Sequence, residues 1–201
     1  MKASMVGDEQ ELISRAQQGD TVAFQEIIDR YKKQVYYLSL DLTGNHHDAE
    51  DLSQEVMVKA YTSIHKFRGE SKISSWLHRI AVNAHLDERR KKSLTLLKQS
   101  DELNETLTVH NSEGSLESNP EKKMERAKIQ EHINEALLTL TERERTIFVL
   151  RHYHEHALKE IAEMLNLSEG TIKSFLFRAI KKLQKALSQY EYQFEGRSSN
   201  E

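Results

Sequence analysis

The apolar residues of this chain recur at intervals of three and four, which places them on one face of an α-helix. No sustained alternation of apolar and polar residues, the pattern of a β-strand, runs through the sequence. A single Pro and seven Gly among 201 residues also favour long helices, because both residue types interrupt them. The pattern therefore predicts an all-α protein.

Four helices are predicted in the first 95 residues. Asp20 or Thr21 can cap the second of them, and Gly44 can end it. The third begins with acidic residues, which favour the positive end of a helix dipole. Ser71 or Ser74 can cap the fourth. The approximate ranges are 8–18, 21–44, 46–64 and 73–92.

The helical pattern stops between residues 99 and 121, a stretch with six acids and neither Lys nor Arg. Such a segment has too little apolar surface to fold on its own, so a flexible acidic linker is predicted. The sequence therefore predicts two small helical domains, 1–95 and 121–188, joined by a linker at 96–120 and followed by a tail at 189–201.

The second domain has the pattern of a helix-turn-helix. Thr141 and Glu144 have the spacing of a capping box. In the segment 158–174, Asn166 suits a left-handed turn and Ser168 can cap the helix that follows. The second helix of such a motif enters the major groove of DNA, so this domain is expected to read duplex DNA.

The fourth helix of the first domain carries the only Trp, Trp76, and ends in four consecutive cations, Arg89 to Lys92. Between Lys72 and Lys92 there are six cations and two acids, an excess of four. Cations follow a phosphate backbone, aromatic rings stack on bases, and Asn83 can read a base edge, so this helix suits single-stranded DNA. The alternative is an ordinary amphipathic helix whose Trp belongs to the core.

Parts of both domains resemble the extracytoplasmic-function (ECF) sigma factors, the small sigma subunits of bacterial RNA polymerase. The first domain contains segments similar to their core-polymerase-binding helix and their promoter-melting segment, and the second contains one similar to their helix-turn-helix. The resemblance covers most of the chain from Gly19 to Leu187. The matching motifs are DAEDLSQEVMVKAY at 48–61, FRG at 67–69, WLHRIAVN at 76–83 and LSEGTIKS at 167–174.

The resemblance implies a sigma factor that directs core RNA polymerase to specific promoters. The first domain would bind the core enzyme and would capture and melt the minus-ten element, and the second would read the minus-thirty-five element. Such a protein is not an enzyme and needs no cofactor. Its partners would be core polymerase, promoter DNA and an anti-sigma factor, which in many family members is linked to the membrane.

The resemblance also implies roles for residues of the first domain. Asn83 matches a position that contacts the captured base, and Arg79 and Arg90 would hold the neighbouring backbone. The implied minus-ten DNA residues are Phe67, Arg68, Lys72, Trp76, Arg79, Asn83, Arg89 and Arg90. The implied core-polymerase residues, which would dock on the clamp helices of the largest subunit, are Asp51, Gln54 and Glu55.

In the second domain the minus-thirty-five candidates lie along the second helix of the helix-turn-helix. Phe175 departs from the family, which often has Arg at this position, and this weakens the case that all the usual upstream contacts are retained. Lys181, Lys182 and Lys185 are placed to contact phosphate, which positions the protein without specifying sequence. The full set of candidates is Glu169, Thr171, Lys173, Ser174, Phe177, Arg178, Lys181 and Lys182.

Composition limits the other functions. There is no Cys, which excludes disulfides and thiolate sites, and the net charge of -3 does not by itself indicate a nucleic-acid binder. No apolar run is long enough to cross a bilayer and the N-terminal stretch lacks the apolar core of a signal peptide, so we expect a soluble cytoplasmic protein without membrane insertion.

Two alternatives remain open. A metal-dependent enzyme is suggested by His46-His47 and by His152, His154 and His156, but alternate residues do not share a helix face, and no metal site is predicted. The second alternative is a helix-turn-helix activator, which needs no polymerase-docking helix. Binding to core polymerase in the absence of DNA separates an activator from a sigma factor.

Overall fold

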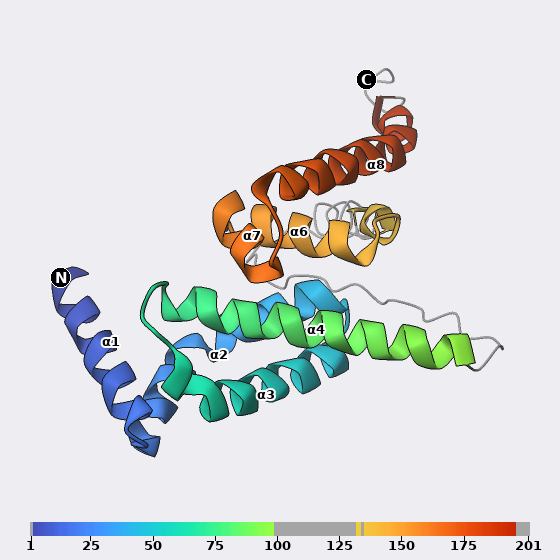
Figure 1. Cartoon of the computed structure of the whole chain (residues 1–201). Helices are drawn as coiled ribbons and strands as arrows, with labels where there is room; N and C mark the ends of the chain where they lie inside the picture. Colours follow the sequence, from blue (N-terminus) through green and yellow to red (C-terminus); the bar gives the residue numbers. More distant parts are fainter. Residues whose placement is uncertain (1, 99–131, 134, 196–201) are drawn as a thin grey trace, which may run out of the picture. The chain divides into compact units, whose positions relative to one another are not determined.

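The computed structural model describes residues 2–98, 132–133 and 135–195. The described residues form helices joined by short turns and loops, and none of them forms a strand, which confirms the prediction of an all-α protein (Figure 1). The chain divides into two compact units, Met1–Leu107 and Thr108–Glu201. Most of the predicted linker lies outside the described residues, so its flexibility and the exact domain boundaries stay predictions. No described helix is both long and apolar enough to cross a membrane.

The N-terminal unit contains all four predicted helices and a short 3₁₀ helix, η1. The first helix begins at Lys2, earlier than predicted. The prediction placed its start too late because the first turns of this helix lack the apolar repeat from which the start was inferred. The fourth continues past the predicted domain end at residue 95. The bounds are α1 Lys2–Gln17, α2 Thr21–Thr43, α3 His46–Ser63, η1 Ile64–Lys66 and α4 Ile73–Lys98.

Local capping fixes where these helices start and end. The Asp20 carboxylate accepts hydrogen bonds from the backbone N–H groups of Val22 and Ala23, which start α2. Gly44 ends α2 at φ 80°, a conformation that a residue without a Cβ adopts at little cost. Asn45 then caps α3 by accepting from the Asp48 N–H. The short α2–α3 connection makes these two helices neighbours.

The core of the N-terminal unit lies between α2, α3 and α4, and Figure 1 shows these three helices side by side. Helix α1 packs on α2 through buried apolar residues that include Leu12 and Ala16. Two polar contacts reinforce this packing: Tyr31 donates to Glu9, and Arg30 pairs with Asp8 at 2.8 Å. The core side chains of α3 and α4 are Ala49, Leu52, Val56, Ala60, Ile73, Leu77, Ala81, Val82 and Ala84.

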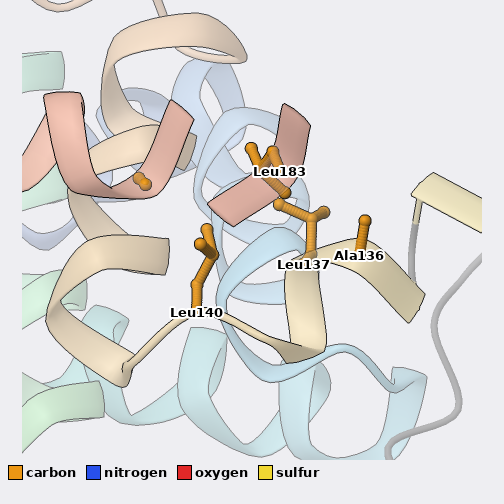
Figure 2. Packing of buried hydrophobic residues seen from close by; sticks show 5 residues of the cluster. Ala136, Leu137, Leu140 and Leu183 are labelled. Carbon is orange, nitrogen blue, oxygen red and sulfur yellow. The ribbon is translucent and has the colours of Figure 1, made fainter. Parts of the chain in front are cut away.

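The C-terminal unit contains α6 (Glu142–His152), α7 (Leu158–Leu165) and α8 (Glu169–Glu195). Helix α8 runs beyond residue 188, where a tail was predicted to begin. One buried cluster joins the segment before α6 to α8, as Figure 2 shows for Leu137, Leu140 and Leu183. The predicted capping box is confirmed, since Thr141 and Glu144 exchange backbone-to-side-chain hydrogen bonds at the start of α6.

The turn of the helix-turn-helix has the predicted geometry. Asn166 ends α7 in the left-handed region at φ 53° and ψ 49°, and its N–H donates to the carbonyl of Ala162. Ser168 caps α8, since its hydroxyl accepts from the Thr171 N–H at 3.1 Å. Ile161 and Ile172, one on each helix of the motif, are fully buried, so the turn angle is fixed by apolar packing as well as by the backbone.

Replacing Asn166 tests this turn. Asn166→Ala should destabilise the C-terminal unit by about 1 kcal/mol, because a Cβ without a compensating polar group disfavours the left-handed region. Asn166→Gly is the matched control and should be tolerated. Urea unfolding followed by far-UV circular dichroism measures the change. The fluorescence of Trp76, the only Trp, reports on the N-terminal unit and should show an unchanged transition. Equal stability of the Ala and Gly variants would contradict the role given to Asn166.

Candidate nucleic-acid interface

The first candidate surface is the exposed side of α4, which we call the α4 face and define as Trp76, Arg79, Asn83 and Arg90. Helical spacing brings these residues to one side of α4, over a length of about 21 Å. Asn83 and Arg90 are exposed, whereas Trp76 and Arg79 are half-buried. Arg90 pairs with Asp87 at 2.9 Å, an exposed contact that a phosphate can replace at little cost. The four residues therefore lie on the same side of α4.

A residue of the loop that precedes α4 packs against Trp76. The Phe67 side chain is 8% exposed, and its ring lies 5.3 Å from that of Trp76 between centroids. Because it is buried, the Phe67 ring positions Trp76 and is not available to stack on a base. Arg68 and Lys72 are exposed and Arg89 is half-buried, so the remaining predicted cations reach solvent around the α4 face.

Gln17 holds the base of this loop and was not identified from the sequence. Its side-chain amide donates to two backbone carbonyls, those of Phe67 at 2.6 Å and Ile64 at 3.2 Å. A Gln at the end of a helix gives no sequence signal for such a role, because its partners lie 47 and 50 residues away. The contact fixes the position from which the loop leads into α4.

The second candidate surface lies on α3 and is acidic. Asp51, Gln54 and Glu55 are exposed, opposite the buried face of that helix, as the apolar spacing predicts. Val58 and Tyr61 extend the same side and are 64% and 51% exposed. An acidic surface with exposed apolar side chains is unsuited to DNA and fits a protein partner.

The third candidate surface is the N-terminal half of α8. Lys173, Ser174, Phe177 and Arg178 line a shallow open hollow, and Lys181 lies over the Phe177 ring at 4.6 Å. Glu169 is exposed. Thr171 is half-buried, and its hydroxyl is hydrogen-bonded to that of Ser168 at 2.8 Å, so it serves the helix start.

Phe175 supports Arg178 on this surface. The Arg178 guanidinium carbon lies 4.6 Å from the centroid of the Phe175 ring, a cation–π contact. The Phe175 ring therefore packs against a neighbouring cation of this surface.

Glu144 of α6 places a buried charge against α8. Its side chain is 4% exposed, and Lys182 donates to its Oε2 at 2.6 Å, while Arg178 Nε lies 3.8 Å from Oε1. Burial alone would raise the pKa of Glu144, but the hydrogen bonds from Lys182 and Thr141 hold this pKa below its ordinary value. Glu144 is therefore ionised at neutral pH, and Lys182 has a partner within the protein as well as a predicted one on DNA.

Two family models match the chain, Sigma-70 region 2 over residues 27–95 and Sigma-70, region 4 over residues 136–185. The ECF RNA polymerase sigma factor SigW of Bacillus subtilis (strain 168) is 35% identical over 179 residues, covering 87% of this chain and 94% of that protein. The chain belongs to the ECF sigma factors of RNA polymerase. The ECF RNA polymerase sigma-E factor of Haemophilus influenzae is 33% identical, covering 85% of this sigma factor and 90% of the relative.

Solved structures agree with the fold of this sigma factor. The sigma factor RpoE of Bartonella quintana, in complex with the anti-sigma factor NepR, matches with a TM-score of 0.66 at 23% identity. The match covers 82% of this chain and 96% of that one. As an ECF sigma factor the protein recognises promoter DNA and initiates transcription. The α4 face and the acidic side of α3 lie within the region 2 match, and the N-terminal half of α8 lies within the region 4 match.

The histidines that suggested a metal site have separate roles in this sigma factor. The His152 ring packs on Phe148 with centroids 4.5 Å apart, and the His156 ring is buried with Nδ1 3.5 Å from a Glu160 oxygen. In the N-terminal unit, His46 at the start of α3 is hydrogen-bonded to Tyr36 of α2. Within the described parts of the chain, no three side chains of the metal-binding types converge.

Gln17→Met tests the support of the loop. Met has a similar length but no donor, so two carbonyls lose their partner and the N-terminal unit should lose about 1 kcal/mol of stability. Denaturant unfolding followed by Trp76 fluorescence measures the change, because the Trp76 ring lies on Phe67. Gln18→Met, at the exposed neighbouring position, is the matched control. A transition midpoint for Gln17→Met equal to that of the control would contradict this role.

Proposed function

We propose that this sigma factor uses its three surfaces for three steps of initiation. The acidic side of α3 docks on core RNA polymerase, the α4 face captures and opens the minus-ten element, and α8 reads the minus-thirty-five element. The protein itself performs no catalysis and acts in the cytoplasm, where the polymerase and the promoter are. The observation that carries the proposal is the separation of acidic and basic surfaces on different helices of one unit.

The α4 face has the chemistry needed to hold an unpaired base. Opening a promoter requires a base to leave the stack at a cost of a few kcal/mol, so an open state needs compensating contacts. Trp76 offers a half-buried aromatic ring for stacking, and the exposed Asn83 amide offers both a donor and an acceptor. Arg79 and Arg90, on the same side of α4, supply positive charge for the adjoining phosphates.

The exposed start of α8 supports a major-groove contact. Residues at the beginning of the second helix of a helix-turn-helix face base edges, and Lys173 and Arg178 lie there with their charged ends accessible. Phe175 holds Arg178 in place from the side. We assign Lys173 and Arg178 to base contact and Lys181 to phosphate.

An anti-sigma factor is a further partner in this proposal. The related RpoE structure contains the anti-sigma factor NepR, and the structure of CnrH in complex with the cytosolic domain of CnrY matches the fold with a TM-score of 0.62. The exposed apolar side chains Val58 and Tyr61 beside the acidic residues of α3 suit a protein that competes with polymerase for this surface.

Run-off transcription with purified core polymerase on a promoter library tests the function directly. Glu55→Lys should abolish run-off and binding to core in the absence of DNA, because a cation replaces an acid at the centre of the docking surface. Glu11→Lys is the matched control: it makes the same charge change at an exposed position of α1 instead of α3. Core binding that resists Glu55→Lys, or that is lost equally in both variants, would contradict the assignment of this surface.

Asn83→Ala tests the capture of the minus-ten base. Loss of a base-edge contact worth about 1–3 kcal/mol should reduce permanganate-detected strand opening by about 5- to 150-fold. The loss should be smaller on a template already unpaired at the minus-ten element, because the base is then free without a cost. Core binding should be intact. Ser93→Ala, exposed further along α4, is the control. Normal opening of paired DNA by Asn83→Ala would falsify this role.

A further inference from the structure

A buried carboxylate lies against the DNA-facing helix of the C-terminal unit. Glu144 sits in the first turn of α6, is 4% exposed, and meets Lys182 at 2.6 Å across 38 residues of sequence. Lys182 belongs to the same basic run of α8 as Lys181, but it is turned toward α6 and is only 41% exposed. The two lysines are adjacent in sequence and differ in their surroundings.

The charge of Glu144 is not needed to start α6. In a capping box the third residue after the cap accepts a hydrogen bond from the cap N–H, and Gln serves this purpose as well as Glu. Here Glu144 Oε2 accepts from the Thr141 N–H at 2.9 Å, and the same oxygen accepts from Lys182. The capping explains a polar residue with an acceptor at this position. The negative charge also favours the start of the helix dipole, and its shortest ion pair is with Lys182, with Arg178 farther away at 3.8 Å.

The pair is costly to separate once it is formed. A charge without a partner at a buried position destabilises a protein far more than the intact pair stabilises it. If Lys182 moved to a phosphate, it would leave the Glu144 carboxylate buried and without its main cation. A phosphate contact by Lys182 is therefore disfavoured, whereas Lys181, which lies over Phe177 at the surface, carries no such restraint.

We propose that Glu144 holds Lys182 away from DNA and so lowers the sequence-independent part of the affinity of α8 for promoter DNA. Each phosphate that a protein neutralises adds about 0.9 to the slope of log affinity against log salt concentration. Removing one cation from this set weakens binding to every sequence alike, because phosphates carry no base information. The preference for the minus-thirty-five element is unaffected. This inference rests on the proposed function, in which α8 faces DNA.

Glu144→Gln tests the inference, because it keeps the capping acceptor and removes the charge. Holoenzyme is assembled with core polymerase and bound to an upstream duplex that contains the minus-thirty-five element selected by the run-off assay and stops before the minus-ten element. Affinity is measured between about 50 and 200 mM salt. The variant should bind more tightly, with a salt slope steeper by about 0.9, while its preference over a scrambled duplex is unchanged.

Two further variants isolate Lys182. In the double variant Glu144→Gln with Lys182→Met, the released cation is removed and no charge is left buried, so the slope should return to that of wild type. Glu163→Gln, on the exposed side of α7, removes one negative charge from the same unit without touching Lys182, and should leave the slope unchanged. Far-UV circular dichroism of each variant checks that α6, α7 and α8 are formed.

Three results would overturn the inference: an unchanged slope for Glu144→Gln, a steeper slope that persists in the double variant, or an equal change in Glu163→Gln. The variant Lys173→Ala distinguishes a failure of this inference from a failure of the proposed function. If Lys173→Ala alters the preference for the minus-thirty-five duplex while Glu144→Gln leaves the slope unchanged, α8 reads DNA and only the role of Glu144 is wrong. If Lys173→Ala leaves the preference intact, the assignment of α8 itself is wrong.

Discussion

The step of about 100° between successive helical residues is the constraint on which the rest of this structure depends. A helix in a small unit must bury one side, and only the other side is left for a partner. On α3 the buried side contains Leu52 and Val56, so Asp51 and Glu55 face solvent. The same division on α4 leaves Asn83 outside while Ala84 is packed. The residues available for binding in this sigma factor are therefore those on the exposed sides of the helices, which do not pack in the core.

This constraint also explains which features could be predicted. Periodicity and caps act within one helix or turn, so Asp20, the Thr141–Glu144 box and the left-handed Asn166 were all recognisable in the sequence. Contacts between distant segments leave no such pattern. The amide of Gln17 meets Phe67 and the carboxylate of Glu144 meets Lys182 only because the packed helices bring them together. Phe67 shows the same limit, since its motif indicates its location near the α4 face but not that its ring is buried.

Charge is distributed in this protein by surface and by helix, so the net charge of -3 says little about its partners. Exposed acids on α3 repel DNA and can steer the helix toward a cationic protein surface. The cations of α4 and α8 lie on other helices than these acids. A short Debye length, about 8 Å at physiological salt, lets surfaces of opposite sign act almost independently within one small unit. The acidic and basic surfaces are separated because the acids and the cations stand in different segments of the sequence.

The approach to the α4 face combines fixed ends with an open middle. At one end the Gln17 amide holds the carbonyl of Phe67, and at the other Ile73 is fully buried as α4 begins. Between them Arg68, Gly69 and Lys72 are exposed, and Gly69 has φ 73° with no atom within 4 Å of where a Cβ would lie. In the proposed capture of a base, fixed ends would reduce the entropy lost on binding, because the chain is already held at both sides. The exposed middle of the loop is where a nucleotide would enter. Capture of an unpaired base needs both properties, since a loop free along its whole length would lose more entropy on binding and a packed loop would have no space for the base.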